Sequence, residues 1–397
     1  MHTRNYFRNA VILGLITAVG PFGVDMYLPA LPSIGADLGA ESNNVVILSL
    51  TSYFVAFGLM QIVFGTLSDM YGRKPPLYAG IGLFIAATIG CALATDINTL
   101  IIMRFFQGVG GAAGIIIPRA IVRDMYSGTE EVKMMSLLML VFSVSPLLAP
   151  LGGSLLVEEY GWRSTFWVLT LLGGMGLVLL AFFVRETWPP EKRIKSDVGA
   201  MKAAYKALFA DREFMGMTFI GAFAITGFFI YLGNSSFILS QHYGLNELQY
   251  SLAFSVNAAA FFAATQLNGW LSEKYGMRAL IIPSATGFAA VMAALAALFV
   301  LGADSFWMMS VMLFIGFSFV GILMPNITVL SLENHGDKAG SAASLMNTIQ
   351  LVIGSIVIGI TGALNNGTPM PMVCGIGVAA LLTLLTSVWT FGKKHPA

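Results

Sequence analysis

Long apolar runs separated by short polar segments dominate the pattern along the chain. A membrane-spanning helix needs about 20 mostly apolar residues, and runs of that length predict six spans in the first half, at residues 9–31, 43–67, 76–95, 99–121, 133–156 and 163–184. A second set falls at residues 213–239, 247–270, 278–301, 306–332, 340–362 and 370–391. The pattern therefore predicts an all-α membrane protein whose twelve transmembrane helices form two pseudo-symmetric six-helix bundles.

The longest polar stretch, roughly residues 185–212, lies between the two sets of spans. Its basic residues are Arg185, Lys192, Arg193, Lys195, Lys202, Lys206 and Arg212. We interpret the stretch as a cytoplasmic linker, part of which is an amphipathic helix lying on the membrane. The chain is then divided into an N-terminal six-helix bundle at 1–184, the linker, and a C-terminal six-helix bundle at 213–397.

Basic residues favour one side of the predicted bundles. With all twelve spans counted, every Lys and Arg except Arg104 and Arg163 falls on the same side, whereas the opposite loops carry mainly acids such as Asp37, Glu41 and Asp96. Loops rich in Lys and Arg face the cytoplasm. We therefore expect both termini to be cytoplasmic, and one miscounted span would destroy this pattern.

Composition agrees with a membrane protein. Hydrophobic residues make up 57% of the chain and charged residues 10%, against about 25% charged residues in soluble proteins. The net charge of +1 gives no basic face for nucleic acid. Cys91 and Cys374 lie in apolar runs, so we interpret them as small buried hydrophobes and not as a disulfide or a metal site.

A ten-residue segment occurs twice, once in each half. Residues 65–74 read GTLSDMYGRK and residues 269–278 read GWLSEKYGMR, each after the second span of its half. Such repeats are typical of transporters that rock two halves around a central site. We expect a polar latch in which glycines permit tight turns and charged groups pair across the seam between the halves; its residues are Gly65, Asp69, Gly72, Arg73, Lys74, Glu273, Gly276 and Arg278. The alternative is two similar tight turns with ordinary topogenic charges.

Several segments carry a resemblance to a known family. Residues 65–75 resemble the loop motif of the major facilitator superfamily, and residues 104–112, RFFQGVGGA, resemble its fourth-helix motif. Residues 25–32, DMYLPALP, together with residues 119–124, RAIVRD, resemble the Bcr/CflA group of drug–proton antiporters. The resemblance implies the major facilitator fold, a monomer in the bacterial inner membrane, and export of bicyclomycin- or chloramphenicol-like drugs by alternating access.

Two segments depart from the family pattern. Met70 stands where the group usually has a base in the loop motif, which weakens the expected latch. In the fifth-helix antiporter motif Pro146, Pro150 and Gly153 are kept, but alanine and serine replace two glycines at 149 and 154. The sequence therefore indicates antiport less firmly than it indicates the superfamily.

Two ionisable residues lie deep inside predicted spans. At a rise of 1.5 Å per residue, Asp25 lies roughly 10 Å below the outer end of the first span and Arg104 roughly 8 Å below the outer end of the fourth. A charge facing lipid costs about 3 kcal/mol, so both side chains are expected to face a polar interior. We hypothesise that Asp25 binds and releases the coupling proton and that Arg104 lies near it. The alternatives are a static ion pair, or two separate groups bonded to backbone and water.

Neutral polar and aromatic residues are scattered through the remaining spans. Such a mixture suits a cavity for an uncharged or weakly charged amphipathic solute, although packing against lipid or other helices explains each aromatic residue as well. The candidate lining residues are Tyr27, Tyr53, Gln61, Tyr231, Asn234, Asn257, Asn347 and Gln350.

The chain carries no motif for catalysis, cofactor binding or ATP hydrolysis. No H-E-x-x-H, G-x-S-x-G or G-x-x-x-x-G-K-[ST] sequence occurs, so we expect a transporter driven by an ion gradient, with no enzyme activity, cofactor or metal. The leading interpretation is a proton-coupled antiporter that exports small amphipathic drugs, with the substrate, protons and the lipid bilayer as its partners and no nucleic acid. The alternatives are a proton-coupled carrier for one metabolite, such as an amino acid, a nucleoside or a siderophore precursor, and a non-transporting sensor or scaffold.

Overall fold

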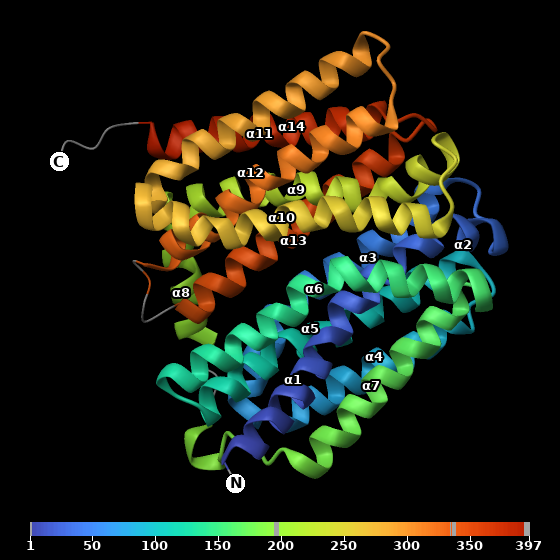
Figure 1. Cartoon of the computed structure of the whole chain (residues 1–397). Coiled ribbons are helices and arrows are strands. Elements are labelled where there is room, and N and C mark those ends of the chain that lie inside the picture. Colours follow the sequence, from blue (N-terminus) through green and yellow to red (C-terminus); the bar gives the residue numbers. More distant parts are fainter. Residues whose placement is uncertain (1, 194–197, 334, 336–338, 393–397) are drawn as a thin grey trace. The chain divides into compact units, whose positions relative to one another are not determined.

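Helices joined by short loops make up the part of the chain that the computed structural model describes, which comprises residues 2–193, 198–333, 335 and 339–392. It divides into two compact units, Met1–Asp197 and Val198–Ala397 (Figure 1). Helices satisfy their own backbone hydrogen bonds, which makes them one of the few structures that can cross a bilayer. The predicted all-α architecture is confirmed.

The first unit contains the helices of the N-terminal half. Its long helices and short 3-10 turns, in chain order, are α1 (His2–Asp25), η1 (Leu28–Ala30), α2 (Leu31–Asp37), α3 (Asn43–Tyr71), α4 (Lys74–Ala92), α5 (Ile97–Met125), α6 (Gly128–Tyr160), α7 (Arg163–Phe183) and η2 (Pro190–Lys192).

The second unit begins with a shorter helix and continues with long ones. Its elements, including one π-helical turn labelled η3, are α8 (Val198–Ala210), α9 (Arg212–Phe237), η3 (Ile238–His242), α10 (Glu247–Tyr275), α11 (Met277–Val300), α12 (Phe306–Glu333), α13 (Ala339–Ala363) and α14 (Met370–Phe391).

Eleven helical segments within the described residues are long and apolar enough to cross a membrane. The remaining predicted span, 247–270, corresponds to α10, which is 29 residues long but is not among the eleven. Its polar side chains Ser251, Asn257 and Asn268 are buried. They lower the mean hydropathy of α10 while lying inside unit 2, where they do not face lipid.

The first span differs from its prediction as one continuous helix over 9–31. Helix α1 ends at Asp25, and the chain then forms η1 and α2, all within one apolar stretch from Tyr6 to Asp37. Pro29 and Pro32 stand in the first turns of η1 and α2. Proline has no N–H to donate to the preceding turn, so the helix stops and restarts.

Close packing around α5 depends on its glycines. A Cβ at Gly108 would lie 2.3 Å from the Tyr53 carbonyl oxygen on α3, and a Cβ at Gly110 would lie 2.4 Å from the Gly80 carbonyl oxygen on α4. Only a residue without a side chain fits at these approaches. The glycines of the fourth-helix motif therefore set how α3 and α4 pack on α5.

The predicted linker divides between the two units. Arg185–Arg193 belongs to unit 1, residues 194–197 lie outside the described residues, and α8 begins unit 2. Leu208 of α8 is buried against α9 and α13, in a cluster with Phe214, Ala342, Leu345 and Met346. Part of the apolar face of α8 is thus covered by protein. The position of α8 on the membrane surface stays a prediction. So does the division of the chain into two bundles and a separate linker. The predicted cytoplasmic bases Lys195, Lys338, Lys393 and Lys394 also lie outside the described residues.

Candidate functional site

The basic loops of unit 1 gather at one end. Arg73, which precedes α4, binds Asp124 at the end of α5 through a 2.8 Å bond, and Lys74 Nζ donates to the Val184 carbonyl after α7 at 2.7 Å. At the other end, Asp37, the last residue of α2, accepts bonds from the side chains of Trp162 and Arg163, just before and at the start of α7. The loops therefore alternate between two ends, as the charge pattern predicted; which end faces the cytoplasm stays a prediction.

Asp25 is the last residue of α1 and is 4% exposed. Ser145 on α6 donates a 2.7 Å hydrogen bond to its Oδ2 atom. A carboxylate is unfavourable at the C-terminal, negative end of a helix dipole, and no ion pair to Asp25 occurs among the described residues. Asp25 is thus a buried acid whose side-chain partner among the described residues is one hydroxyl. The sequence analysis missed Ser145, although it stands directly before Pro146 of the antiporter motif.

Arg104 on α5 is fully buried and lies between two aromatic rings. Its guanidinium carbon lies 4.3 Å from the ring centre of Tyr27 and 4.4 Å from that of Tyr53. Nη1 donates to the Gly23 carbonyl at 2.7 Å and to Gln107 Oε1 at 2.6 Å, whereas Nε and Nη2 have no hydrogen-bond partner in the described residues. The rings stabilise a buried cation by cation–π attraction. Arg104 therefore ties α5 to the last turn of α1.

The two intramembrane charges are near in the fold but do not pair. Gly23, which accepts from Arg104, is two residues before Asp25, yet no ion pair joins the two side chains in the part of the chain described. The interpretation as a static ion pair is wrong for this conformation, because each group has its own neutral partners. The role of Asp25 in proton coupling stays a prediction.

The predicted cavity residues of unit 1 are buried in its packing. Tyr27 OH and Ser49 Oγ are 2.7 Å apart, and Tyr53 OH donates to the Gly20 carbonyl at 2.8 Å. Gln61 on α3 is 3% exposed, and its Oε1 atom has no hydrogen-bond partner. The rings of Tyr27 and Tyr53 therefore lie against Arg104. The Oε1 atom of Gln61 accepts no hydrogen bond from the described residues.

The predicted cavity residues of unit 2 form two polar pairs within an aromatic core. Asn257 Nδ2 donates to Tyr231 OH at 3.1 Å, and the Tyr231 ring stacks on Phe254. Asn234 Nδ2 donates to Thr361 Oγ1 at 3.1 Å. Asn347 on α13 is partly buried, and Gln350 on the same helix is buried with no hydrogen-bond partner for its Nε2 atom. The assignment of these residues to a substrate cavity stays a prediction.

The first copy of the repeated loop forms a compact polar cluster. Gly72 has a positive φ of 95°, which lets the chain turn sharply between α3 and α4. Arg73 is 5% exposed; it binds Asp69 and Asp124, and its guanidinium lies 4.5 Å from the Trp188 ring centre. Burial alone would lower the pKa of Arg73, but the two carboxylates outweigh this and raise it.

Glu186 completes this cluster and was missed by the sequence analysis. Its carboxylate accepts from the backbone N–H groups of Arg73 at 2.8 Å and Lys74 at 3.0 Å, at the start of α4, and from those of Thr187 and Trp188. Burial alone would raise the pKa of Glu186, but these four N–H donors lower it. The residue acts as an anion bound at a helix N-terminus.

The second copy of the loop is more open. Gly276 has a positive φ of 83°, as its counterpart does, but Arg278 pairs with Glu213 at 2.8 Å where both side chains are largely exposed. The partners found for Arg73, Lys74 and Arg278 each lie in the same unit as the base itself, and the pairing of bases across the two halves stays a prediction. A latch role stays a prediction for all eight loop residues named in the sequence analysis, including Gly65, which faces Ile116 of α5, and Glu273 on α10.

The antiporter-motif helix packs against the break in the first span. A Cβ at Gly153 on α6 would lie 2.4 Å from the Met26 carbonyl oxygen, one residue after Asp25. Pro146 and Pro150 lie inside the same helix, next to Ser145. The kept residues of the motif thus stand where α6 contacts the end of α1.

Comparison with known proteins agrees with this architecture. Residues 13–359 match the profile of the Major Facilitator Superfamily. The MFS-type transporter YdgK of Bacillus subtilis (strain 168) is 35% identical over 94% of this chain and 92% of its own, and the bicyclomycin resistance protein homolog of Haemophilus influenzae is 30% identical over 94% and 93%. The crystal structure of a D-xylose–proton symporter covers 98% of this chain and 99% of its own, with a TM-score of 0.76 at 17% identity.

These matches confirm the resemblance found in the sequence. The family profile spans most of both units, and the similarity to the symporter structure shows the shared fold. A relative named for bicyclomycin resistance agrees with the resemblance to the Bcr/CflA group. This chain therefore belongs to the major facilitator superfamily and is a multi-pass membrane transporter of that type.

Proposed function

We propose that the chain is a proton-coupled antiporter that exports small amphipathic drugs by alternating access. The observation that carries the proposal is Asp25, a buried acid at the broken end of α1 with one hydroxyl partner and no counter-ion among the described residues. A permanently charged carboxylate in this position would be costly. A carboxyl group that is protonated in one state and charged in another explains why an acid occupies the site.

Ser145 suits both protonation states of Asp25. A hydroxyl donates to a charged carboxylate, and after rotation it accepts from a protonated one. The 2.7 Å bond between Ser145 and Asp25 can therefore persist while the proton comes and goes. A lysine in place of Ser145 has no acceptor and would favour the charged state only.

Arg104 supports the site without carrying the proton. A guanidinium does not release its proton in a protein, and its Nη1 atom holds the Gly23 carbonyl two residues before Asp25. We assign it to positioning the end of α1. A rotation of α1 that brings Asp25 toward water or substrate would strain this bond, which links the position of α1 to that of α5.

The direction, location and substrates complete the proposal. The basic end of unit 1 faces the cytoplasm by the positive-inside rule, so both termini are cytoplasmic, in the bacterial inner membrane, and the chain acts as a monomer. Bicyclomycin- and chloramphenicol-like compounds are the substrates, supported by the resemblance to the Bcr/CflA group and by a relative named for bicyclomycin resistance.

The test is drug transport in inverted membrane vesicles with an imposed pH gradient. The wild type should concentrate chloramphenicol or bicyclomycin in the acidic lumen, whereas Asp25→Asn should retain only downhill movement of the drug. The matched control is Asp96→Asn at the start of α5, since asparagine also caps a helix and Asp96 is exposed. Undiminished uphill transport by Asp25→Asn would end the proposal.

A further inference from the structure

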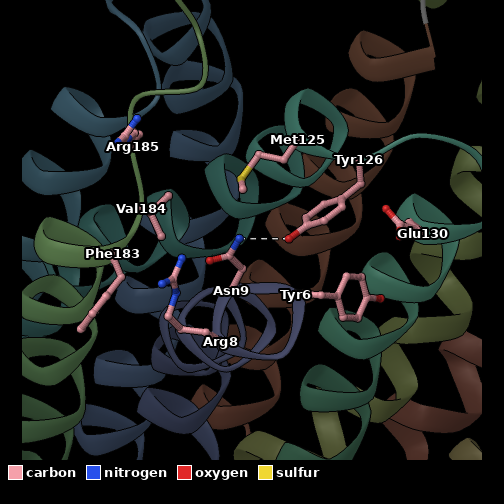
Figure 2. A pocket seen from close by; sticks show the side chains of 9 residues that line it. All are labelled: Tyr6, Arg8, Asn9, Met125, Tyr126, Glu130, Phe183, Val184 and Arg185. Carbon is pink, nitrogen blue, oxygen red and sulfur yellow. Dashed lines mark hydrogen bonds between the residues drawn. The ribbon is translucent and has the colours of Figure 1, made fainter. Parts of the chain in front are cut away.

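A polar hollow of about 450 Å³ lies in unit 1, apart from Asp25 and Arg104, at the ends of four helices. It is formed by the start of α1, the junction of α5 with α6, and the end of α7 (Figure 2). Its lining residues are Tyr6, Arg8, Asn9, Met125, Tyr126, Glu130, Phe183, Val184 and Arg185. Because the ends of spanning helices lie at the headgroup level of a bilayer, a ligand in this hollow meets lipid headgroups first.

The charges in the hollow favour an anion. Arg8 and Arg185 contribute two positive charges and Glu130 contributes one negative charge. No ion pair of Arg8, Arg185 or Glu130 occurs among the described residues. Two unpaired guanidinium groups at one site suit a phosphate, which arginine binds through several N–H groups.

Three polar atoms at the hollow have no hydrogen-bond partner within the part of the chain that the structure describes. They are Arg8 Nε, Asn9 Oδ1 and Tyr6 OH. Asn9 is only 4% exposed, and its amide nitrogen donates to Tyr126 OH at 3.0 Å, as the dashed line in Figure 2 shows. An unsatisfied buried polar atom costs about 1–3 kcal/mol. A ligand with both an anionic oxygen and a hydroxyl donor would satisfy Arg8 and Asn9 together.

Apolar side chains flank the same site. Phe182 and Phe183 are 80% and 46% exposed at the end of α7. The Arg8 guanidinium lies 5.4 Å from the Phe183 ring centre. A free phosphate ion gains nothing from these apolar surfaces, whereas the acyl chains of a lipid would cover them.

We propose that this hollow, which we call the α1–α7 headgroup site, binds the headgroup of an anionic phospholipid, phosphatidylglycerol. Its phosphate is held by Arg8 and Arg185, its glycerol hydroxyls donate to Asn9 Oδ1, and its acyl chains lie on Phe182 and Phe183. Basic pockets between spanning helices are known to select anionic headgroups. The proposal concerns lipid recognition and holds whether or not Asp25 carries a proton.

Native mass spectrometry of the purified, delipidated full chain tests the site. Phosphatidylglycerol should bind more tightly than phosphatidylcholine. Removing one charge, in Arg8→Gln or Arg185→Gln, should weaken phosphatidylglycerol binding about fivefold, as one basic residue near an anionic surface is worth about 1 kcal/mol. The matched control is Arg278→Gln, an exposed base in unit 2, which should bind as the wild type does.

Further variants separate loss of the site from loss of folding. Arg8→Lys keeps the charge and should retain most of the binding, and Asn9→Ala should weaken phosphatidylglycerol more than phosphatidylcholine. Equal binding of the two lipids, or unchanged binding in both glutamine variants, would overturn the proposal. Inorganic phosphate that binds as tightly as the lipid and depends on Arg8 would overturn the lipid assignment in favour of a soluble anion.

Discussion

Glu186→Gln removes one negative charge from the N-terminal end of α4 with almost no change in size. In the wild type, the Glu186 carboxylate accepts four backbone N–H bonds, two of them from Arg73 and Lys74. The glutamine amide keeps one oxygen acceptor and turns the other position into a donor. At least one backbone N–H then loses its partner, and the helix dipole loses its counter-charge.

The size of the effect follows from these bonds. Hydrogen bonds to charged groups contribute about 1.5–3 kcal/mol and neutral ones about 0.5–1.5 kcal/mol. Glu186 is partly exposed, and solvent screening reduces the sum. We expect unit 1 to lose about 1–2 kcal/mol of stability, or about 3–6 °C in the midpoint of thermal unfolding.

The pH dependence of this loss has a definite sign. Since the folded pKa of Glu186 is lowered, its contribution is complete above the ordinary value of 4.5 and is lost as the pH falls through the folded value. Thermal unfolding in detergent measures the difference in unfolding midpoint between the wild type and Glu186→Gln. This difference should be complete at pH 7 and should vanish below the folded pKa of Glu186. Glu191→Gln, an exposed neighbour, is the control. Equal losses in the two variants, or a gap that widens in acid, would refute the reasoning.

Three further substitutions test the packing and the site. Gly108→Val should prevent folded expression because a Cβ there meets the Tyr53 carbonyl, whereas Gly152→Ala, with open space around its Cβ, should change the unfolding midpoint little. Arg104→Lys should lower drug transport at least tenfold because an ammonium cannot stack as a plane between Tyr27 and Tyr53; unchanged transport would contradict the positioning role. Arg73→Lys should lower the free energy of unfolding by about 1–2 kcal/mol, because it keeps the charge but loses the stacking on Trp188 and the paired hydrogen bonds to Asp124. An unchanged free energy of unfolding would mean that the charge alone stabilises the loop.

The positions of most helices follow from the sequence because the bilayer imposes length and hydropathy on each span. The span predicted at 370–391 coincides with α14, Met370–Phe391, and that at 163–184 ends one residue from the end of α7, Phe183. The first span shows the limit. Its hydropathy continues through Asp37, but the regular α-helix ends at Asp25 because of the prolines that follow.

The partners of the site residues could not be predicted in the same way. Asp25 and Arg104 stand out in the sequence because charges inside a span are rare. Ser145 and Glu186 do not stand out, because nothing in the neighbouring sequence distinguishes a functional serine in a span, or a functional acid in a loop, from an ordinary one. Their bonds join residues 120 and 113 positions apart in the chain, so only the packing of the helices reveals them.

Proton release on drug binding tests the role of Asp25 most directly. Purified protein in weakly buffered detergent is mixed with chloramphenicol or bicyclomycin while the pH is recorded. If drug binding displaces the proton of the Asp25 carboxyl group, the wild type releases protons when it binds the drug. Asp25→Asn then binds the drug and releases no protons. Equal proton release from both proteins would contradict the account.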